Sequence, residues 1–227
     1  MPNSTIERRA PRRLLGALMM ALVAPTACGG GDGPAGGPDA TSIDAVATDA
    51  NTAPMTSAEI TAARGTADGT GLSLPITLAT VTYVKPAIGS PTNDPIGFNI
   101  QAEQAGPALY VAVDPAMLSP VPAVGDVVSF TITELATLNG LKMARAITGF
   151  SRSATGVDVN PLVQDLTAAA DVVTALGNYE SELFDLSGSV SGAFLASGTG
   201  FERAPIATTG IASDANFMIR IPAALAF

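Results

Sequence analysis

The side chains that most enzymes use for catalysis or metal binding are scarce in this chain. Its 227 residues include a single cysteine, Cys28, and no histidine. A Ser-His-Asp triad, a Cys-His pair and a histidine-ligated metal site are therefore excluded. Carboxylate chemistry remains, but no pair of acidic residues has a sequence context that sets it apart as a glycosidase dyad. We therefore expect a protein that is not an enzyme and that uses no metal or other cofactor.

Cys28 follows a segment with the layout of an export signal. Arginines cluster within residues 8–13, an apolar run covers residues 14–24, and the small residue Ala27 stands directly before the cysteine. A helix that crosses a bilayer needs about 20 apolar residues, and this run is shorter. The pattern predicts a signal peptide over residues 1–27.

The cleavage region resembles a lipobox, the motif after which bacteria attach diacylglycerol to a cysteine. Thr26-Ala27-Cys28-Gly29 matches its small residues, whereas Pro25 stands where the family usually has leucine. The resemblance implies a lipoprotein anchored through Cys28. Because the next residue is not aspartate, it implies the outer membrane of the bacterial envelope. The alternative is an ordinary secreted protein with a free thiol, for which the chain offers no disulfide partner.

Residues 28–55 are rich in glycine, alanine, proline, aspartate and threonine, and they contain no aromatic residue. Such a composition cannot bury enough apolar surface to offset the entropy lost on ordering. We expect a disordered tether between the lipid anchor and the folded part.

A short helix and then five strands are expected after the tether. Thr56-x-x-Glu59 has the form of a capping box and Gly65 can end a helix, which predicts a helix over residues 57–64. From residue 72 onwards, segments rich in Val, Ile, Thr, Tyr and Phe alternate with Gly and Pro. This pattern predicts strands near residues 76–84, 98–102, 109–113, 128–132 and 141–150.

Two local signals indicate how these strands connect. In the first strand the apolar phase slips by one residue between Leu78 and Val81, which predicts a bulge or sharp bend. Asn139-Gly140 predicts a tight hairpin between the last two strands. A bent first strand followed by four others predicts an all-β fold with a small closed barrel.

Several stretches resemble the OB-fold-like domains of secreted bacterial proteins, some of which stand ahead of extracellular nuclease or lamin-tail domains. These stretches are residues 60–70, Val81-Thr-Tyr-Val, Gly97-Phe-Asn-Ile-Gln, Ala108-Leu-Tyr-Val, Val124-Gly-Asp-Val-Val and Asn139-Gly-Leu. The resemblance implies an OB-fold-like domain over residues 56–157. It brings no catalytic residue, because nothing here corresponds to a nuclease domain. An alternative is the N-terminal fragment of a larger extracellular hydrolase, such as a nuclease, that lacks its catalytic domain.

Residues 158–227 are similar in part to the first domain. A helical connector comes first, with a short helix expected over residues 168–176. Leu186-Ser-Gly-Ser-Val is then similar to Leu78-Ala-Thr-Val, and Gly200-Phe201 is similar to Gly97-Phe98. We expect a second, partial OB-like β unit, either truncated or packed on the first barrel.

OB barrels bind ligands on the face of strands 2 and 3 and in the loops that join strands 1–2 and 4–5. On this chain that face predicts a ligand site of aromatic rings beside bases, formed by Tyr83, Lys85, Phe98, Tyr110, Lys142 and Arg145. Such a site suits single-stranded nucleic acid or an oligosaccharide. The formal net charge of −9 disfavours extended polyanions and favours the alternative, contact of the sheet edges with envelope proteins.

Overall fold

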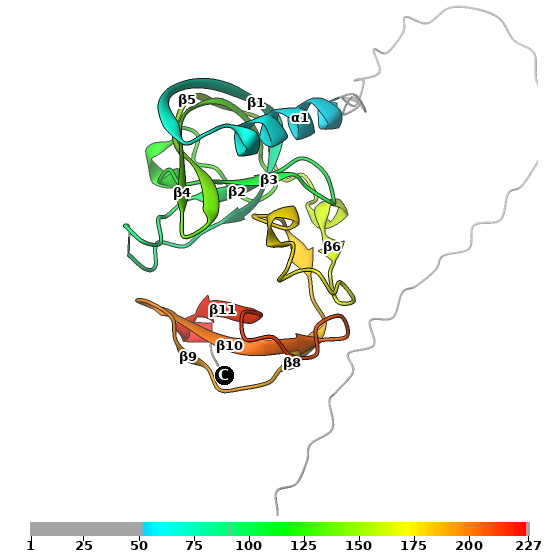
Figure 1. Ribbon diagram of the computed structural model, residues 1–227. Helices are drawn as coiled ribbons and strands as arrows, with labels where there is room; N and C mark the ends of the chain where they lie inside the picture. Colours follow the sequence, from blue (N-terminus) through cyan, green and yellow to red (C-terminus); the bar gives the residue numbers. More distant parts are fainter. Residues whose placement is uncertain (1–51, 91, 226–227) are drawn as a thin grey trace, which may run out of the picture. The chain divides into compact units, whose positions relative to one another are not determined.

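The structure, a computed structural model, describes residues 52–90 and 92–225 (Figure 1). All of these residues belong to one compact unit. The predicted signal peptide, Cys28 and most of the predicted tether lie outside the described residues. The end of that tether is helical, because helix α1 (Thr52–Gly65) begins at Thr52. Pro54 is tolerated there, since the first helical turn needs no backbone N–H donor.

Five strands close into a barrel in the order β1-β2-β3-β5-β4. They are β1 (Gly69–Val84), β2 (Phe98–Gln101), β3 (Ala108–Val111), β4 (Val127–Leu138) and β5 (Leu141–Ala154). Neighbouring strands run antiparallel, except that β3 and β5 run parallel. The predicted all-β fold with an OB-like five-stranded barrel is therefore confirmed.

β1 pairs with both β2 and β4, and it bends near Leu78. Ile76 pairs with Phe130 and Ala79 pairs with Val128, so the register shifts between these two pairs. Leu78 takes up the extra residue with a φ of 55°, and its side chain is exposed. The slip in apolar phase thus correctly predicts a bulge, although Leu78 itself lies outside the core.

The two-residue turn Asn139-Gly140 joins β4 to β5, as predicted. Their φ angles are 54° and 87°, the left-handed conformation that a type I′ turn requires at both central positions. Leu138 pairs with Leu141 directly across the turn. The resulting hairpin closes the barrel between β3 and β1.

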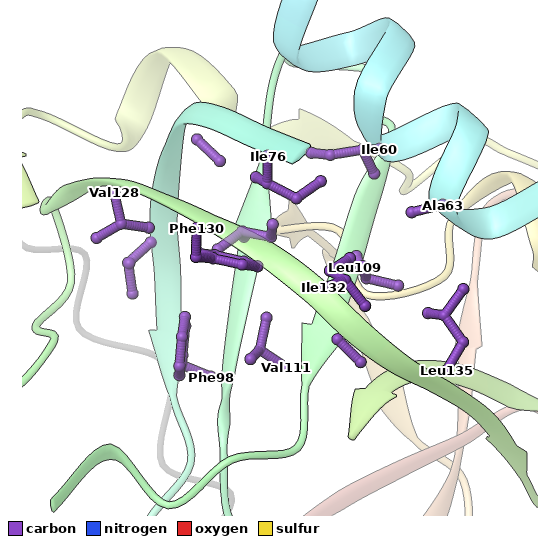
Figure 2. Close-up of a cluster of buried hydrophobic side chains, with 14 residues drawn as sticks. Ile60, Ala63, Ile76, Phe98, Leu109, Val111, Val128, Phe130, Ile132 and Leu135 are labelled. Carbon is purple, nitrogen blue, oxygen red and sulfur yellow. The ribbon is translucent and has the colours of Figure 1, made fainter. Parts of the chain in front are cut away.

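Alternate residues of the strands fill the barrel (Figure 2). Val128, Phe130 and Ile132 of β4 are all buried and belong to one cluster, as their period of two predicts. Ile60 and Ala63 of α1 are fully buried in the same cluster. Each large apolar side chain removed from water contributes roughly 1.5–3 kcal/mol. The helix therefore completes the barrel core.

The predicted capping box is wrong, because its two residues bind the barrel instead. The Thr56 hydroxyl donates to the Thr77 carbonyl oxygen at 2.5 Å. The Glu59 carboxylate accepts from the Thr77 backbone N–H at 2.6 Å and from its hydroxyl at 2.9 Å. Thr77 lies in the bulge of β1, where the register shift leaves its backbone groups in need of other partners. The helix starts at Thr52, before the predicted range of 57–64, so Thr56 lies inside it, whereas its end at Gly65 is as expected.

Short elements make up the rest of the described chain. A 3-10 helix η1 (Pro115–Met117) precedes β4, and the segment after the barrel contains η2 (Asn160–Leu162), β6 (Gln164–Asp165), η3 (Leu176–Asn178), β7 (Phe184–Asp185), β8 (Gly188–Val190), β9 (Leu195–Ala196), β10 (Phe201–Thr208), β11 (Met218–Pro222) and η4 (Ala223–Leu225). The helix predicted over residues 168–176 is wrong, since turns occupy this stretch. Its β-branched run Val172-Val173-Thr174 disfavours a helix. Val172 is instead buried beside Leu166 and Phe217.

β10 is flanked by β11 on one side and by β8 and β9 on the other. All these pairs are antiparallel. β8 and β9 pair with different parts of β10, since Ile206 pairs with Val190 and Glu202 pairs with Ala196. The register shifts between these two pairs. β8 and β9 therefore act as two parts of one bent strand along β10. The order β8/β9-β10-β11 and its antiparallel directions are the same as those of β1-β2-β3. Within residues 158–225 no further strand closes this sheet into a barrel.

Gln101 joins the barrel to the segment that follows it. This side chain is fully buried at the end of β2. Its carbonyl oxygen accepts from the Leu183 backbone N–H at 2.7 Å, and its amide donates to the Leu162 carbonyl oxygen at 2.9 Å. A buried amide is stable only when such partners are present. Gln101 therefore fixes two points of the later segment on the barrel.

Candidate binding cleft

A cavity of about 750 Å³ opens on the barrel at the place where OB barrels hold their ligands. The β1–β2 loop, β2, β3 and the turn between β4 and β5 form one wall, and residues of the C-terminal segment form the other. It is lined by Tyr83, Lys85, Ser90, Asn93, Asp94, Pro95, Asn99, Tyr110, Leu138, Asn139, Leu141, Met143, Ser181, Ser197, Gly198, Thr199 and Arg220. Three of the six predicted site residues, Tyr83, Lys85 and Tyr110, lie in this cleft.

The two tyrosines have different roles in the cleft. Tyr83, at the end of β1, is 43% exposed and lines the cleft, so its ring is available to a ligand. Tyr110 is buried, and its hydroxyl donates to the Pro95 carbonyl oxygen at 2.5 Å. Burial, followed by the nearby Asp94 carboxylate, raises the pKa of both phenols. Both tyrosines are therefore neutral at physiological pH.

Lys85 folds the β1–β2 loop instead of presenting a free charge. Its ammonium group donates to the Ile88 carbonyl oxygen at 3.0 Å and to the Asp94 carbonyl oxygen at 3.2 Å. It also lies 3.5 Å from the Asp94 carboxylate. This loop carries Ser90 and Asn93 into the cleft. Lys85 therefore holds in place polar residues that can bind a ligand, while its own charge is paired with Asp94.

Arg220 of β11 is a cleft residue that the sequence does not reveal. Its guanidinium donates to the Asp94 carboxylate at 2.8 Å and to the Ser197 carbonyl oxygen at 3.1 Å. The same group lies 3.8 Å from the centre of the Phe201 ring, a cation–π contact. Asp94 thus forms ion pairs with two bases, Lys85 and Arg220, which leaves a formal charge of +1 on the three groups, and it links the β1–β2 loop to the C-terminal sheet.

Three predicted site residues lie elsewhere. Phe98 is fully buried in the barrel core, because it shares its phase with Ile100, and it cannot touch a ligand. Lys142 donates to the Thr66 carbonyl oxygen at 2.5 Å and to the Asp68 carboxylate at 2.6 Å. This hydrogen bond lowers the pKa of Asp68. Arg145 is exposed on β5 and does not line the cleft.

Amide and hydroxyl groups supply most of the polar lining that sequence reasoning missed. Asn93, Asn99 and Asn139 present amides, and Ser90, Ser181, Ser197 and Thr199 present hydroxyls. Each amide offers both donors and an acceptor, and each hydroxyl offers one donor and two acceptor lone pairs. Such a set can bind a neutral ligand that carries many hydroxyl groups. Asn139 could have been found from sequence, since the loop of strands 4–5 was expected to contribute.

A second, smaller hollow lies between α1, the β2–β3 loop and residues 177–182, and it contains an unusual carboxylate. Glu182 is buried, and its Oε2 atom has no hydrogen-bond partner among the described residues. Burial is the main reason that the pKa of Glu182 rises to about 7, and the charge of Arg64 opposes this only in part. The carboxyl group faces Gly106, where an added side chain would meet its Oε1 atom at 1.9 Å.

Comparison with protein families, curated proteins and solved structures found no match for this chain. Among the helices of residues 52–90 and 92–225, none has the length and apolar character needed to cross a membrane. The geometry of the cleft is therefore the main evidence on function.

Proposed function

We propose that this protein is an outer-membrane lipoprotein of the bacterial envelope that displays a non-catalytic OB-like module, and that its barrel cleft binds a neutral oligosaccharide. The observation that carries this proposal is the cleft of about 750 Å³, which combines an exposed ring with amides and hydroxyls. The lipid anchor and its location rest on the sequence around Cys28. The resemblance to secreted bacterial OB-like domains points to the same compartment.

The charges of the cleft favour a neutral ligand over a nucleic acid. Lys85 and Arg220 are both paired with Asp94, at 3.5 Å and 2.8 Å. Outside the cleft, Lys142 and Arg152 also lie within ion pairs. Binding to a nucleic acid depends on bases that neutralise several phosphates, and here the bases have carboxylate partners. The net charge of −9 adds a general repulsion of polyanions.

The shape and chemistry of the lining favour a sugar chain. The C–H face of a pyranose ring is apolar and packs on an aromatic ring, as Tyr83 offers at 43% exposure. The hydroxyl groups at the sugar's rim can exchange hydrogen bonds with the amides of Asn93, Asn99 and Asn139. A pocket with one apolar platform and a few convergent polar groups is typical of specific ligand sites.

Binding of the full chain, solubilised in detergent, to an array of neutral and acidic oligosaccharides tests this proposal. We expect binding to neutral glycans, and Tyr83→Ala should weaken it at least tenfold, about 1.4 kcal/mol, because the stacking platform is lost. Arg145→Ala is the matched control and should change nothing, since Arg145 lies outside the cleft. Binding to single-stranded oligonucleotides but to no glycan would contradict the proposal.

The anchor has its own test. Cys28→Ser removes the only thiol of the chain. We expect this variant to lose fatty-acid labelling and to move from the membrane fraction to the soluble fraction, since stable anchoring requires the acyl chains. Ala27→Gly keeps the cysteine and serves as the control. Labelling that persists in Cys28→Ser would rule out this anchor.

A further inference from the structure

Residues 177–183 form a short segment that is fastened to the barrel by hydrogen bonds near its end. The Glu180 carboxylate accepts from the Lys142 backbone N–H at 3.2 Å. The Leu183 backbone N–H donates to the Gln101 side chain at 2.7 Å. The segment itself consists of the end of η3 and turns, and it belongs to no strand. Segments of this kind are the parts of a fold that open locally while the rest stays folded.

The carboxyl group of Glu182 is buried in this segment without a partner for its charge. Glu182 is 7% exposed, and its Oε2 atom has no hydrogen-bond partner among the described residues. Its Oε1 atom lies so close to Gly106 that a β-carbon there would meet it at 1.9 Å. Burial removes the water that solvates a carboxylate, and no hydrogen bond to Oε2 replaces that water. The position therefore suits the neutral acid and disfavours the carboxylate.

Arg64 of α1 lies beside Glu182 but binds other groups. Its guanidinium donates to the carbonyl oxygen of Gly177, to that of Glu180 at 3.4 Å and to that of Ala108 at 3.2 Å. It also lies 3.9 Å from the Glu180 carboxylate. Because its N–H groups point to these partners, its charge stabilises an ionised Glu182 only in part.

The other groups around the Glu182 carboxyl do not stabilise a negative charge there. Apart from Arg64 and Glu182 itself, the described residues that line the hollow carry no charge. Tyr179 of the same segment is close enough to interact electrostatically with Glu182, and its hydroxyl donates to the Asp171 carboxylate at 2.8 Å. Glu103 of the β2–β3 loop is exposed and carries the same charge as an ionised Glu182. Loss of the proton is therefore opposed from every side except that of Arg64.

Ser181 connects the same segment to the barrel cleft. It lines the cleft, whereas its neighbour Glu182 lines the hollow between α1 and the β2–β3 loop. The φ angle of Ser181 is 67°, a left-handed conformation that residues other than glycine adopt only where their surroundings hold them in it. Any movement of this backbone therefore changes the wall of the cleft.

We propose that residues 177–183 are a pH-sensitive latch on the wall of the cleft. With a proton on its carboxyl group, Glu182 stays buried against Gly106, and the segment holds Ser181 in the cleft. When the proton leaves, the charged group moves to water. α1 is fixed by Ile60 and Ala63 in the barrel core, so the segment moves and α1 does not. The inference concerns the protein without a ligand and does not depend on the proposed function.

The direction of the pH effect follows from the pKa of Glu182, which is about 7 with the latch closed and returns towards 4.5 once the group reaches water. Below pH 4.5 both states are protonated, and the closed latch has its full stability. Between pH 4.5 and 7 the open state releases a proton that the closed state keeps, so the latch loses stability as pH rises. Above pH 7 the loss is complete.

Hydrogen–deuterium exchange of the full chain, measured by mass spectrometry at pH 5 and pH 8, tests the latch. Division of each rate by the intrinsic rate of the same peptide at that pH gives the opening equilibrium. For residues 177–183 we expect this equilibrium to rise at least tenfold from pH 5 to pH 8, because the two pKa values differ by more than one. Peptides of β4 should show no such rise, which verifies that the barrel stays folded.

Two matched variants identify the group responsible. Glu182→Gln keeps the size of the side chain but cannot ionise, and it should keep the segment closed at both pH values. Glu103→Gln removes an exposed carboxyl of the adjacent loop and should show the same rise as the native protein. The proposal is overturned if opening of residues 177–183 does not change with pH in the native protein, or if it rises as much in Glu182→Gln as in Glu103→Gln.

Discussion

The barrel and the C-terminal sheet begin with the same strand order and end in different states. β1-β2-β3 and β8/β9-β10-β11 share their order and antiparallel directions. In the barrel a hairpin covers both edges, and Phe98, Ile100 and Val111 are fully buried. In the second sheet no described strand covers the edges, and Ile219 stays partly exposed. The first three strands supply Phe98, Ile100 and Val111 to the barrel core, and the closing hairpin shields these side chains from water.

Core truncation should separate the two regions most strongly. Phe130→Ala removes a ring from the barrel cluster and should lower the free energy of unfolding by about 3–5 kcal/mol. Phe217→Ala acts on the smaller cluster with Leu166, Val172 and Ile211 and should cost less, because neighbouring side chains can relax around the gap. Urea unfolding of both variants provides the measurement. Equal losses would contradict the idea that the second sheet lacks a closed core.

A smaller effect should appear at Glu182, which adjoins the barrel at Gly106. Its pKa is about 7 in the folded protein against 4.5 ordinarily. Between these two values the folded state keeps a proton that the unfolded state has released, so stability should fall as pH rises from 4.5 to 7. Glu182→Gln has no charge to bury and should be more stable than the native protein above that range, by on the order of 2 kcal/mol.

Urea unfolding at pH 5 and pH 8 measures this difference. The gain from Glu182→Gln should be larger at pH 8, while the exposed control Glu103→Gln should behave alike at both values. If the two pH values give the same gain for Glu182→Gln, the carboxyl of Glu182 does not have the raised pKa in the folded protein.

Structural features that depend only on residues close together in the sequence can be predicted from it. The bulge and the tight hairpin of the barrel are features of this kind. The phase slip near Leu78 predicts the bulge, and Asn139-Gly140 predicts the hairpin, since each signal is a local backbone requirement. The capping box predicted from Thr56 and Glu59 is wrong, because the side chains of both residues bind Thr77. Local patterns cannot distinguish a capping side chain from one used in a tertiary contact.

The cleft could be placed from sequence only in part. The strand pattern points to Tyr83, Lys85 and Tyr110 because they lie on β1, on the loop after it and on β3, all of which line the cleft. Lys142 does not reach the cleft, because its ammonium group binds Asp68, which precedes β1. Arg220 was missed because it comes from the second sheet, and no spacing in the sequence links it to Asp94.

The most direct test of the account is the salt dependence of ligand binding in the cleft. Calorimetric titration of the full chain with the neutral oligosaccharide that it binds best on the array, at about 50 and about 500 mM NaCl, measures it. We predict a Kd that stays the same within about twofold, because a neutral sugar has no charge for salt to screen and releases no counterions when it binds. An affinity that falls tenfold or more with salt, or tighter binding of a single-stranded oligonucleotide at low salt, would contradict a cleft built for neutral sugars.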